Sequence, residues 1–344
     1  GYAYARASPN VADVAEEALA FTARPGDVPI RVARWPAEGP GGLTTEIEGA
    51  ALFARTENVV AIVGHSGSRE SLLGATVYNE AGIPHIVPTS TSRRLADAGP
   101  WTFRLAPNDS VEGDVLAAFI VDSLHLRSAT IFYFADEYGA GLREGVVSGL
   151  KRRGGVVADE VMTPPVGSCP PMSERDDFEV PVEASLRRGM PQVIVLAGRR
   201  VDGGCIMRRV HAAHPELPFV AGDGIEAASP ALAGAVGRAL SRLSAVVFWL
   251  SDSDDSLSIS FRERFRRIVG RDPDDSDAMV YDAFLVLGRA VREGGPTRLA
   301  VRRWLESLGR TRDPFRGVTG RIGFTHERRR ALHLVRPAGP VPPE

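Results

Sequence analysis

Short β-rich apolar runs alternate with amphipathic stretches of helical period along nearly the whole chain. The runs Thr130–Phe134 and Val193–Leu196, for example, are each followed by a stretch in which apolar residues recur at helical spacing. This alternation is typical of parallel sheets with crossover helices, so it predicts an α/β fold. At 344 residues, 44% hydrophobic and 24% charged, the chain is long enough for two such cores, and we expect two lobes.

The same pattern predicts where each element lies. Strands are expected at Ile30–Ala33, Val59–Val63, His85–Val87, Thr102–Leu105, Thr130–Phe134, Val156–Glu160, Val193–Leu196, Phe219–Ala221, Ala245–Phe248, Arg321–Phe324 and Leu332–Val335. Helices are expected at Val11–Ala23, Thr45–Thr56, Arg69–Ala81, Val111–His125, Gly141–Arg152, Phe178–Arg188, Gly204–Ala212, Ile259–Ile268, Ala278–Glu293 and Leu299–Leu308.

Caps and breakers punctuate these elements. Asp109 and Ser110 are expected to cap one helix, and Asp277 another. The proline-rich stretch Thr163–Asp177 is expected to be irregular, and Pro340–Glu344 to be a frayed tail.

Composition argues against several classes of protein. A formal net charge of −2 gives no reason to expect a nucleic-acid partner, since nucleic-acid binding rewards a concentrated basic patch. The lone lysine, Lys151, lies in a basic helix end and is a poor candidate for phosphate binding or Schiff-base chemistry. The longest apolar runs, such as Ala245–Leu250, fall far short of the roughly 20 residues of a membrane-spanning helix.

The first residues and the two cysteines bear on the compartment of the protein. The segment from Gly1 has the pattern of a strand already under way, as expected of a secreted precursor whose signal or lipid-anchor segment has been removed. Cys169 and Cys205 are compatible with one disulfide, and equally with two buried thiols.

Small hydroxyl residues follow two successive apolar runs, those ending at Val63 and Val87. They are Ser66, Ser68, Thr89, Ser90 and Thr91. At the carboxyl end of a parallel strand, backbone N–H groups of the next helix and such hydroxyls form a site suited to a carboxylate. The alternative is that each hydroxyl only caps a helix.

With these motifs in place, the chain resembles the type I periplasmic binding proteins, especially the leucine/isoleucine/valine-binding group that serves ABC importers. The resemblance covers nearly the whole chain and rests on the order and spacing of several short motifs. They are Ile62-Val-Gly-His-Ser-Gly-Ser, Ala81-Gly-Ile-Pro, Pro88-Thr-Ser-Thr, Thr102-Phe-Arg-Leu, Glu137-Tyr-Gly-Ala-Gly-Leu, Ala221-Gly-Asp-Gly and Tyr281-Asp-Ala.

The resemblance implies a role for particular residues. Ser68, Thr89 and Thr91 correspond to residues that hold the α-carboxylate of an amino-acid ligand, and Asp223 corresponds to the acid that receives its α-ammonium group. Tyr138 occupies the family's aromatic position in the second lobe.

Three further observations bear on this site. Asp223 lies between two glycines after an apolar run, where it either faces a cleft or is a turn aspartate. Tyr281 either approaches the ligand from a helix or belongs to the core. Arg199 stands where a relative has tyrosine; it either pairs with a second carboxylate on an acidic ligand or is solvated.

Other motifs suggest catalysis or cofactors. Gly64-His-Ser66-Gly-Ser68 nearly matches the nucleophile elbow of hydrolases, with Ser66 as nucleophile, but its last glycine is missing. The glycines of Gly139–Gly145, with Asp159 further on, resemble a dinucleotide fingerprint, but they begin several residues after the strand. His211 and His214, and the run Asp272–Asp277, have an incomplete set of metal ligands. We therefore expect no cofactor and no metal.

The resemblance implies a type I periplasmic-binding-protein fold, with two Rossmann-like lobes joined by a three-strand hinge. Its lobes would be residues 1–106 plus 250–324 and residues 107–249 plus 325–344. The expected function is a periplasmic or extracellular, monomeric binding protein, not an enzyme, that closes around an amino acid or related carboxylate and presents it to an ABC permease. The alternatives are a ligand-sensing domain of a receptor or regulator with the same fold, and a serine hydrolase.

Overall fold

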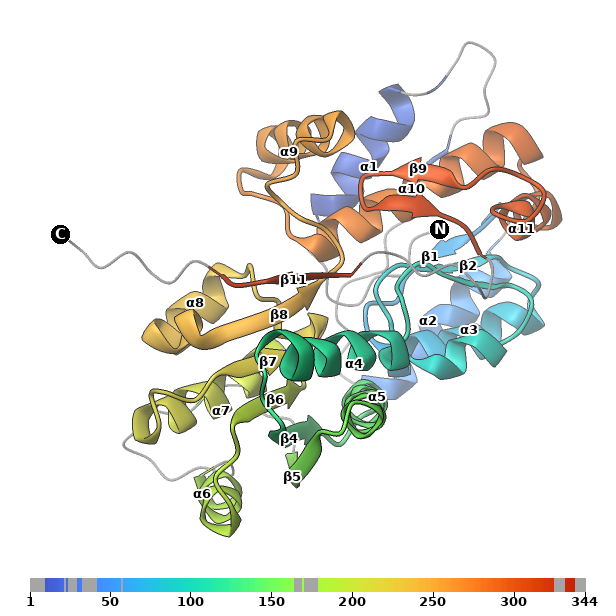
Figure 1. The fold of residues 1–344 in the computed structure, drawn as a ribbon. Coiled ribbons are helices and arrows are strands. Elements are labelled where there is room, and N and C mark those ends of the chain that lie inside the picture. The colour runs from blue at the N-terminus through green and yellow to red at the C-terminus, as the bar shows by residue number, and fades with distance from the viewer. Residues whose placement is uncertain are drawn as a thin grey trace. The chain divides into compact units, whose positions relative to one another are not determined.

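The structure, a computed structural model, describes residues 10–21, 23, 30–32, 42–56, 58–163, 169, 179–324 and 332–337. The chain divides into two compact units, shown in Figure 1: unit 1 comprises Gly1–Pro107 and Phe248–Ala331, and unit 2 comprises Asn108–Val247 and Leu332–Glu344. The expected strand at Gly1, most of the stretch 163–177 and the tail at 340–344 lie outside the described residues.

Unit 1 contains a three-stranded parallel sheet in the order β1–β2–β3. The strands are β1 (Ile62–Val63), β2 (His85–Val87) and β3 (Thr102–Arg104). The helices are α1 (Asn10–Phe21), α2 (Gly42–Arg55), α3 (Ser68–Glu80), η1 (Arg93–Asp97), α9 (Ser256–Val269), α10 (Asp275–Gly294) and α11 (Arg298–Ser307). An antiparallel hairpin of β9 (Phe315–Gly317) and β10 (Gly320–Ile322) completes the unit.

Unit 2 contains a six-stranded sheet in the order β11–β8–β7–β6–β4–β5. The strands are β4 (Ser128–Phe134), β5 (Val156–Thr163), β6 (Val193–Ala197), β7 (Phe219–Ala221), β8 (Leu243–Val247) and β11 (His333–Val335). The helices are α4 (Asp109–Ala118), η2 (Phe119–Ser123), α5 (Glu137–Arg152), α6 (Glu179–Arg188), α7 (Arg200–Ala213), η3 (Asp223–Ile225), α8 (Pro230–Val236) and η4 (Gly237–Arg242). Only β11 among these strands pairs antiparallel, and it lies at the edge beside β8.

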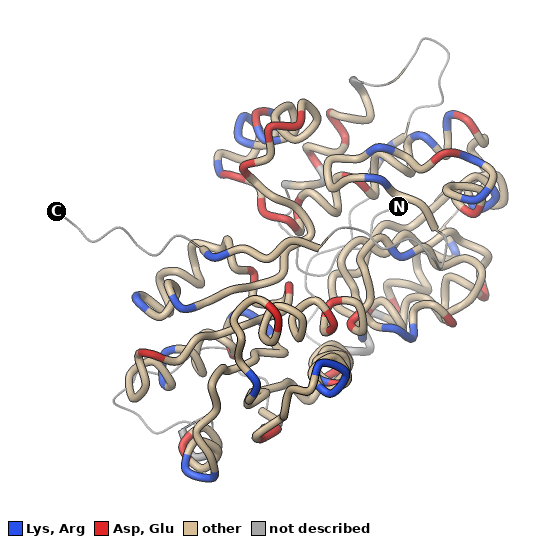
Figure 2. The backbone as a smooth tube through the Cα atoms, in the orientation of Figure 1, with Lys and Arg blue, Asp and Glu red and all other residues tan. Residues whose placement is uncertain are grey.

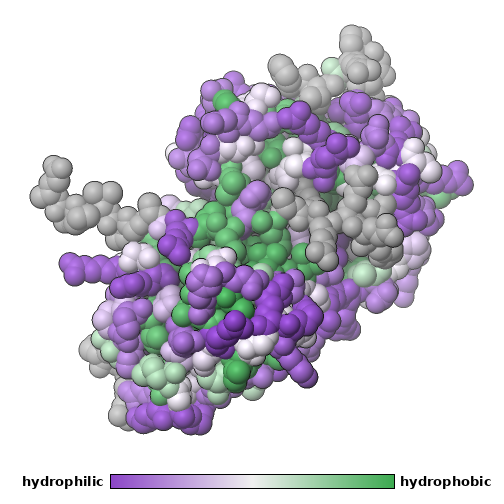
Figure 3. All heavy atoms as spheres, in the orientation of Figure 1, coloured by the Kyte–Doolittle hydropathy of each residue, from purple (hydrophilic) through white to green (hydrophobic). Residues whose placement is uncertain are grey.

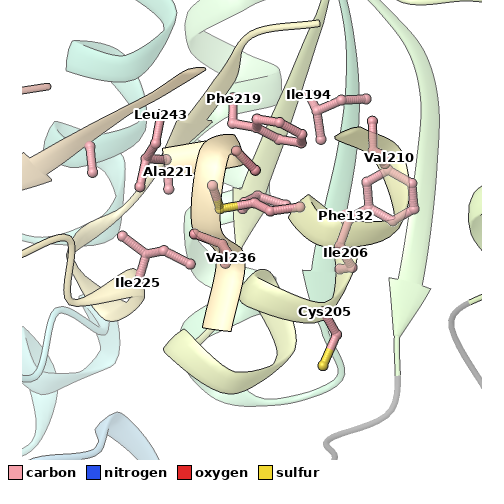
Figure 4. Packing of buried hydrophobic residues seen from close by; sticks show 14 of the residues in the cluster. Phe132, Ile194, Cys205, Ile206, Val210, Phe219, Ala221, Ile225, Val236 and Leu243 are labelled. Carbon is pink, nitrogen blue, oxygen red and sulfur yellow. The ribbon is translucent and has the colours of Figure 1, made fainter. Parts of the chain in front are cut away.

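Strand β6 is buried on both faces because successive side chains of a strand point to opposite sides. Ile194 and Leu196 join one hydrophobic cluster with Phe219 and Ile206, part of which Figure 4 shows. Val193 and Val195 join a second cluster on the other face. The continuous apolar run of this strand, with no polar alternation, is therefore what a central parallel strand between two helical layers requires.

Helices α4 and α5 approach each other closely through glycines. A Cβ atom on Gly113 would lie 2.3 Å from the carbonyl carbon of Gly145, and one on Gly145 would lie 2.3 Å from the backbone oxygen of Asp109. Any larger residue at either position would push the helices apart. This close packing places the first turns of α4 against the middle of α5.

The helix caps differ from the sequence-based expectation. Asn108, rather than Asp109 or Ser110, caps α4, because its side chain accepts the N–H of Val111 at 3.0 Å. Asp274 caps α10, and Asp277 lies one turn inside the helix, where the two residues form a capping box. The acidic run that ends at Asp277 is thus a helix start rather than a metal loop.

Several predicted elements also need correction. The strand predicted at Val59–Val63 is only two residues long in β1, and the described residues Ile30–Val32 form no strand. Thr163 is the last residue of β5 instead of the start of an irregular stretch. The helix predicted to run from Val111 to His125 continues after α4 as the π-helical turn η2 and ends at Ser123. The short elements α8 and β9 were not predicted.

Two polar side chains fix backbone segments of unit 1. Arg298, at the start of α11, donates to the carbonyl oxygens of Val59 at 2.8 Å, Ala81 at 3.3 Å and Ala54 at 3.4 Å. The carboxylate of buried Asp282 accepts from the N–H groups of Val318 at 2.7 Å and Thr319 at 2.8 Å, in the turn of the β9–β10 hairpin. Each side chain satisfies several buried backbone groups at once.

The two cysteines form a disulfide between Cys169 and Cys205, with their Cα atoms 5.5 Å apart. No helix in the described part of the chain is long and apolar enough to cross a bilayer. Acidic and basic residues are interspersed along both units in Figure 2. On the face shown in Figure 3, hydrophilic side chains predominate over α9 and over α5.

Candidate functional site

The hydroxyl residues predicted to bind a carboxylate gather at the carboxyl ends of β1 and β2 in unit 1. We call Ser66, Ser68, Thr89, Ser90 and Thr91 the hydroxyl cluster. The two strands are parallel neighbours, so the loops that follow them lie at the same edge of the sheet. The hydroxyl of Thr89 donates to the carbonyl oxygen of Ser66 at 3.2 Å, which links the two loops.

Thr91 is the member of the cluster whose surroundings most favour a ligand. Its side chain is 1% exposed, and its hydroxyl oxygen has no hydrogen-bond partner in the described structure. A buried polar atom without a partner carries a free-energy cost, and most such atoms in proteins are satisfied. A ligand oxygen would satisfy this one.

Ser90, in contrast, has a structural role. Its hydroxyl lies 2.6 Å from the hydroxyl of Ser71 and 3.3 Å from the carbonyl oxygen of His65. Both contacts lie within unit 1 and are buried, so they hold the loop after β2 against the first turns of α3. The hydroxyl of Ser90 thus has partners within unit 1, and its role in ligand binding stays a prediction.

Ser68 is the first residue of α3, directly after the extended cap residue Gly67. Its side chain is 3% exposed. Helix N-termini favour anions, because the first N–H groups lack intrahelical partners and the helix dipole is positive there. The predicted carboxylate position of Ser68 therefore coincides with the start of a 13-residue helix.

Arg104, which the sequence reasoning did not single out, supports the same loop. From the end of β3 it donates to the carbonyl oxygens of Ser92 at 2.9 Å and Thr91 at 3.4 Å. In the sequence, the role of Arg104 was indicated only by its position in the motif Thr102-Phe-Arg-Leu, which resembles that of the family. Arg104 is thus a positioning residue for the hydroxyl cluster.

In unit 2, Asp223 begins the short helix η3 directly after β7. Its backbone N–H donates to the carboxylate of Glu112 at 2.7 Å. One carboxylate oxygen of Asp223 and one of Glu112 are buried and have no hydrogen-bond partner in the described structure. Glu112 is fully buried and was also missed in the sequence, where it looks like an ordinary polar residue of a helix.

Tyr138 lies beneath the same loop. Its ring is 6% exposed, and its hydroxyl accepts the N–H of Gly224 at 3.0 Å. A Cβ atom on Gly222 would lie 2.5 Å from this hydroxyl and 2.7 Å from the carboxylate of Glu112, so only glycine lets the loop come so close. Tyr138 therefore supports the backbone of the Asp223 loop.

Burial and mutual repulsion shift the protonation of this group. Burial raises the pKa of Glu112 well above its ordinary value, and the charges of Asp223 and Asp109 raise it further. Burial also raises the pKa of Asp223 to about 6, against hydrogen bonds from Tyr138 and Glu112 that lower it. The pKa of Tyr138 is raised by burial and by both carboxylates, so the phenol stays protonated.

Arg199 and Tyr281 have partners inside their own units. The guanidinium of Arg199 pairs with Asp136 at 3.1 Å, and Asp136 in turn caps α5. The ring of Tyr281 is 6% exposed and packs against Phe261 with ring centroids 4.6 Å apart. Tyr281 thus packs in the core of unit 1, and its approach to a ligand stays a prediction.

The surroundings of Ser66 do not match those of a catalytic serine. The two buried histidines nearby are occupied elsewhere: Nε2 of His65 lies 3.2 Å from the hydroxyl of Tyr78, and Nε2 of His85 lies 2.6 Å from the carbonyl oxygen of Gly64. Burial lowers the pKa of His65 to about 4 and that of His85 to about 3, far from the range of a general base.

The glycines that resembled a dinucleotide fingerprint serve packing. A Cβ atom on Gly139 would lie 2.6 Å from the backbone of Phe134, and one on Gly141 would lie 2.3 Å from the carboxylate of Asp109. Among the described residues no group of three or more histidine, cysteine or acidic side chains could hold a metal ion. His214 ends α7, where it lies 3.6 Å from Glu216.

The chain forms two α/β units with mostly parallel sheets. Hydroxyl residues follow the strands of unit 1, and an acid follows a strand of unit 2. These features are typical of the class of two-lobed solute-binding folds. The sequence profile of the periplasmic binding protein family matches residues 44–338. The chain therefore belongs to the periplasmic binding protein family, which is a family of solute-binding proteins with the type I fold.

Individual relatives are consistent with this membership. The chain is 26% identical over 274 residues to a Leu/Ile/Val-binding protein homolog of Brucella abortus, covering 78% of this chain and 68% of that protein. It is similar to an ABC transporter substrate-binding protein of Desulfitobacterium hafniense in complex with Leu, with a TM-score of 0.76, 24% identity and coverage of 94% and 92%. A solute-binding protein of R. palustris in complex with benzoate has a TM-score of 0.81 at 15% identity, with coverage of 98% and 92%.

Proposed function

We propose that this protein binds a small aliphatic amino acid outside the cytoplasm and presents it, chemically unchanged, to an ABC permease. The α-carboxylate would be received by Ser68, Thr89 and Thr91, and the α-ammonium group by Asp223. The observation that carries the proposal is the presence of buried, unpartnered oxygens at both ends of this assignment, on Thr91 and on Asp223.

The ligand chemistry follows from the charges of the two groups. The hydroxyl cluster offers donors beside the N-terminus of α3, which suits an anion. The Asp223 group offers only acceptors and negative charge, which suits a cation with several N–H donors. A zwitterion with an ammonium group close to a carboxylate has both features. The similarity to a Leu/Ile/Val-binding protein homolog of Brucella abortus and to a Desulfitobacterium protein in complex with Leu supports an aliphatic side chain.

The pairing of Arg199 with Asp136 argues against an acidic ligand. A guanidinium that is already neutralised at 3.1 Å is a weaker partner for a second ligand carboxylate than a free one. We therefore place leucine, isoleucine and valine ahead of aspartate and glutamate.

Isothermal titration calorimetry with a panel of amino acids tests the proposal. We expect L-leucine, L-isoleucine or L-valine to bind and 4-methylpentanoate, which lacks the ammonium group, to bind at least about tenfold more weakly. Thr91→Val should weaken binding by about tenfold or more, because a hydrogen bond to a charged group is lost. The matched control is Thr76→Val, whose side chain is exposed on α3. If none of the panel bound, the proposed function would be wrong.

The charge assigned to Asp223 has its own variant. Asp223→Asn keeps the shape of the side chain and removes the negative charge, so it should weaken L-leucine binding by about a hundredfold. Equal binding of L-leucine to this variant would remove the ammonium assignment while leaving the carboxylate assignment intact.

Transport and catalysis need separate measurements. Deletion of the gene should abolish high-affinity uptake of the radiolabelled ligand, and uptake should return with the wild-type gene. Normal uptake together with a lost transcriptional response to the ligand would favour a sensor.

A fluorophosphonate probe should leave Ser66 unlabelled, and labelling that disappears in Ser66→Ala would favour a hydrolase. Light scattering should give the mass of a monomer, with and without ligand.

A further inference from the structure

We propose that Glu112 and Asp223 act as one acid pair, and that this pair releases a proton when it receives the ammonium group of the ligand. The inference rests on the proposed function, because it assumes an ammonium group beside Asp223. It adds a residue, Glu112, and a dependence of affinity on pH.

The geometry makes the two acids a single unit. Glu112 comes from the first turns of α4 and Asp223 from the start of η3, which are 111 residues apart in the chain. The N–H of Asp223 donates to one oxygen of Glu112 at 2.7 Å, so the loop is built on the glutamate. The other oxygen of Glu112 is buried and has no partner in the described structure, and so is one oxygen of Asp223.

Two negative charges in this buried position are costly. Glu112 is 0% exposed, so an ionised carboxylate at this position is shielded from water. Two carboxylates that share a site cannot both ionise easily, so the pair retains one proton into the neutral range. The raised pKa values of Glu112 and Asp223 agree with this reading.

The surrounding ionisable groups leave the repulsion uncompensated. Asp109 on α4 adds a negative charge, and Tyr138 on α5 is neutral. On α7, which packs against η3, Asp202 is buried in the first turn, and Arg200 pairs with Glu226 at 2.8 Å. No arginine, lysine or histidine among the described residues pairs with either carboxylate, so we assign the neutralising cation to the ligand.

The proton balance of binding follows. In the free protein the pair carries one proton and one negative charge. The ammonium group of the ligand supplies a positive charge beside Asp223, which lowers the pKa of both carboxylates. The shared proton then leaves to the solvent, and the bound state holds two carboxylates and one ammonium group. Because deprotonation favours binding, affinity should fall by up to about tenfold per pH unit as the pH decreases below 7.

Calorimetry in two buffers measures the released proton directly. L-Leucine is titrated into the wild-type protein at pH 6.5 in phosphate and in imidazole, whose ionisation enthalpies differ. We expect a buffer-dependent binding enthalpy that corresponds to release of a substantial fraction of one proton per ligand. The titration is repeated from pH 5.5 to 8.

The variant Glu112→Gln isolates the glutamate. Glutamine keeps an acceptor for the N–H of Asp223 but cannot ionise, so only Asp223 of the pair can still hold or release a proton. We expect roughly tenfold weaker binding of L-leucine at pH 8, and a clearly smaller proton release and pH dependence than in the wild type. The control is Glu144→Gln, the same change at an exposed position of α5, which should behave as the wild type.

The outcomes are distinct. If the wild type binds L-leucine without proton release between pH 5.5 and 8, the inference is wrong and the proposed function still stands. The same conclusion follows if proton release is unchanged in Glu112→Gln. Failure of the wild type to bind any amino acid of the panel is a failure of the proposed function itself. If Glu112→Gln does not fold, the proton count of the wild type decides, and Glu112→Asp serves as the second variant.

Discussion

The guanidinium of Arg104 donates to the carbonyl oxygen of Ser92 at 2.9 Å, and it reaches the carbonyl oxygen of Thr91 from the same nitrogen. The backbone that carries the unpartnered Thr91 hydroxyl is therefore held by the neighbouring strand β3. A ligand that bonds this hydroxyl meets a loop already fixed in place, which reduces the entropy lost on binding.

Arg104→Gln should loosen this loop. We expect L-leucine to bind about tenfold more weakly, because the loop must be ordered at the cost of part of the binding free energy. Calorimetry measures the affinity, and thermal denaturation reports whether the fold survives. Arg289→Gln, which removes an exposed arginine paired with Glu293 on α10, is the control. An affinity equal to that of the wild type would show that Arg104 does not position Thr91.

Asp282 should be among the most sensitive residues for the stability of unit 1. Asp282→Ala leaves the N–H groups of Val318 and Thr319 without their acceptor, at a cost of about 1–3 kcal/mol for each buried group. Urea denaturation of the variant measures this loss. Asp252→Asn changes an exposed aspartate of the same unit and should leave the free energy of unfolding unchanged.

Acidification should destabilise the protein through His65 and His85. Burial lowers their pKa values to about 4 and about 3, from an ordinary value near 6.5. Between pH 6.5 and these values the unfolded chain binds more protons than the folded one, so the free energy of unfolding falls as the pH decreases. Each histidine contributes up to about 1.4 kcal/mol per pH unit in that window.

Urea denaturation at pH 5, 6 and 7 measures this slope, and the variant with His65→Gln and His85→Gln separates it from other groups. The acid pair of Glu112 and Asp223 acts in the opposite direction, because its raised pKa values make the folded protein bind more protons. Because the double variant lacks both buried histidines, its free energy of unfolding should fall less on acidification than that of the wild type. An identical slope in the two proteins would falsify the histidine assignment.

Reduction of the disulfide should lower the melting temperature. Cys169 and Cys205 are separated by 36 residues, and a cross-link of that span typically contributes about 2–4 kcal/mol. Thermal denaturation with and without a phosphine reductant measures the effect. The variant with serine at both positions should melt near the reduced wild type and should not respond to the reductant. If the reductant left the wild type unchanged, the bridge would make no net contribution.

The α/β class could be predicted because burial on both faces leaves continuous apolar strands. The predicted limits of β2 and β7 agree with the structure residue for residue. The hairpin of β9 and β10 was obscured because its short strands contain glycine and arginine, and its turn depends on the distant carboxylate of Asp282. Asn108, Asp109 and Ser110 can all cap a helix, so the position of the cap is decided by packing alone.

The site was predictable where chemistry follows a strand end, and less so where it depends on contacts across the chain. Asp223 and Thr91 lie in the loops that follow apolar runs, which predicts a place at a sheet edge. Glu112 lies inside a helix and meets Asp223 only after the sheet has formed, because β4, β6 and β7 intervene in the chain. Ser90 and Tyr281 have residue types that suit a ligand, but their internal partners are visible only in the folded protein.

Because Arg298 contacts residues far earlier in the chain, it bears on the order in which the parts of unit 1 fold. This side chain binds the carbonyl oxygens of Ala54, Val59 and Ala81, which lie more than two hundred residues earlier in the chain. Among the described residues, unit 2 takes only the segment 332–337, with the edge strand β11, from the chain beyond Val247, whereas unit 1 takes three helices and a hairpin from it. The segment that contains Ala54, Val59 and Ala81 therefore reaches its final contacts only after α11 has joined unit 1.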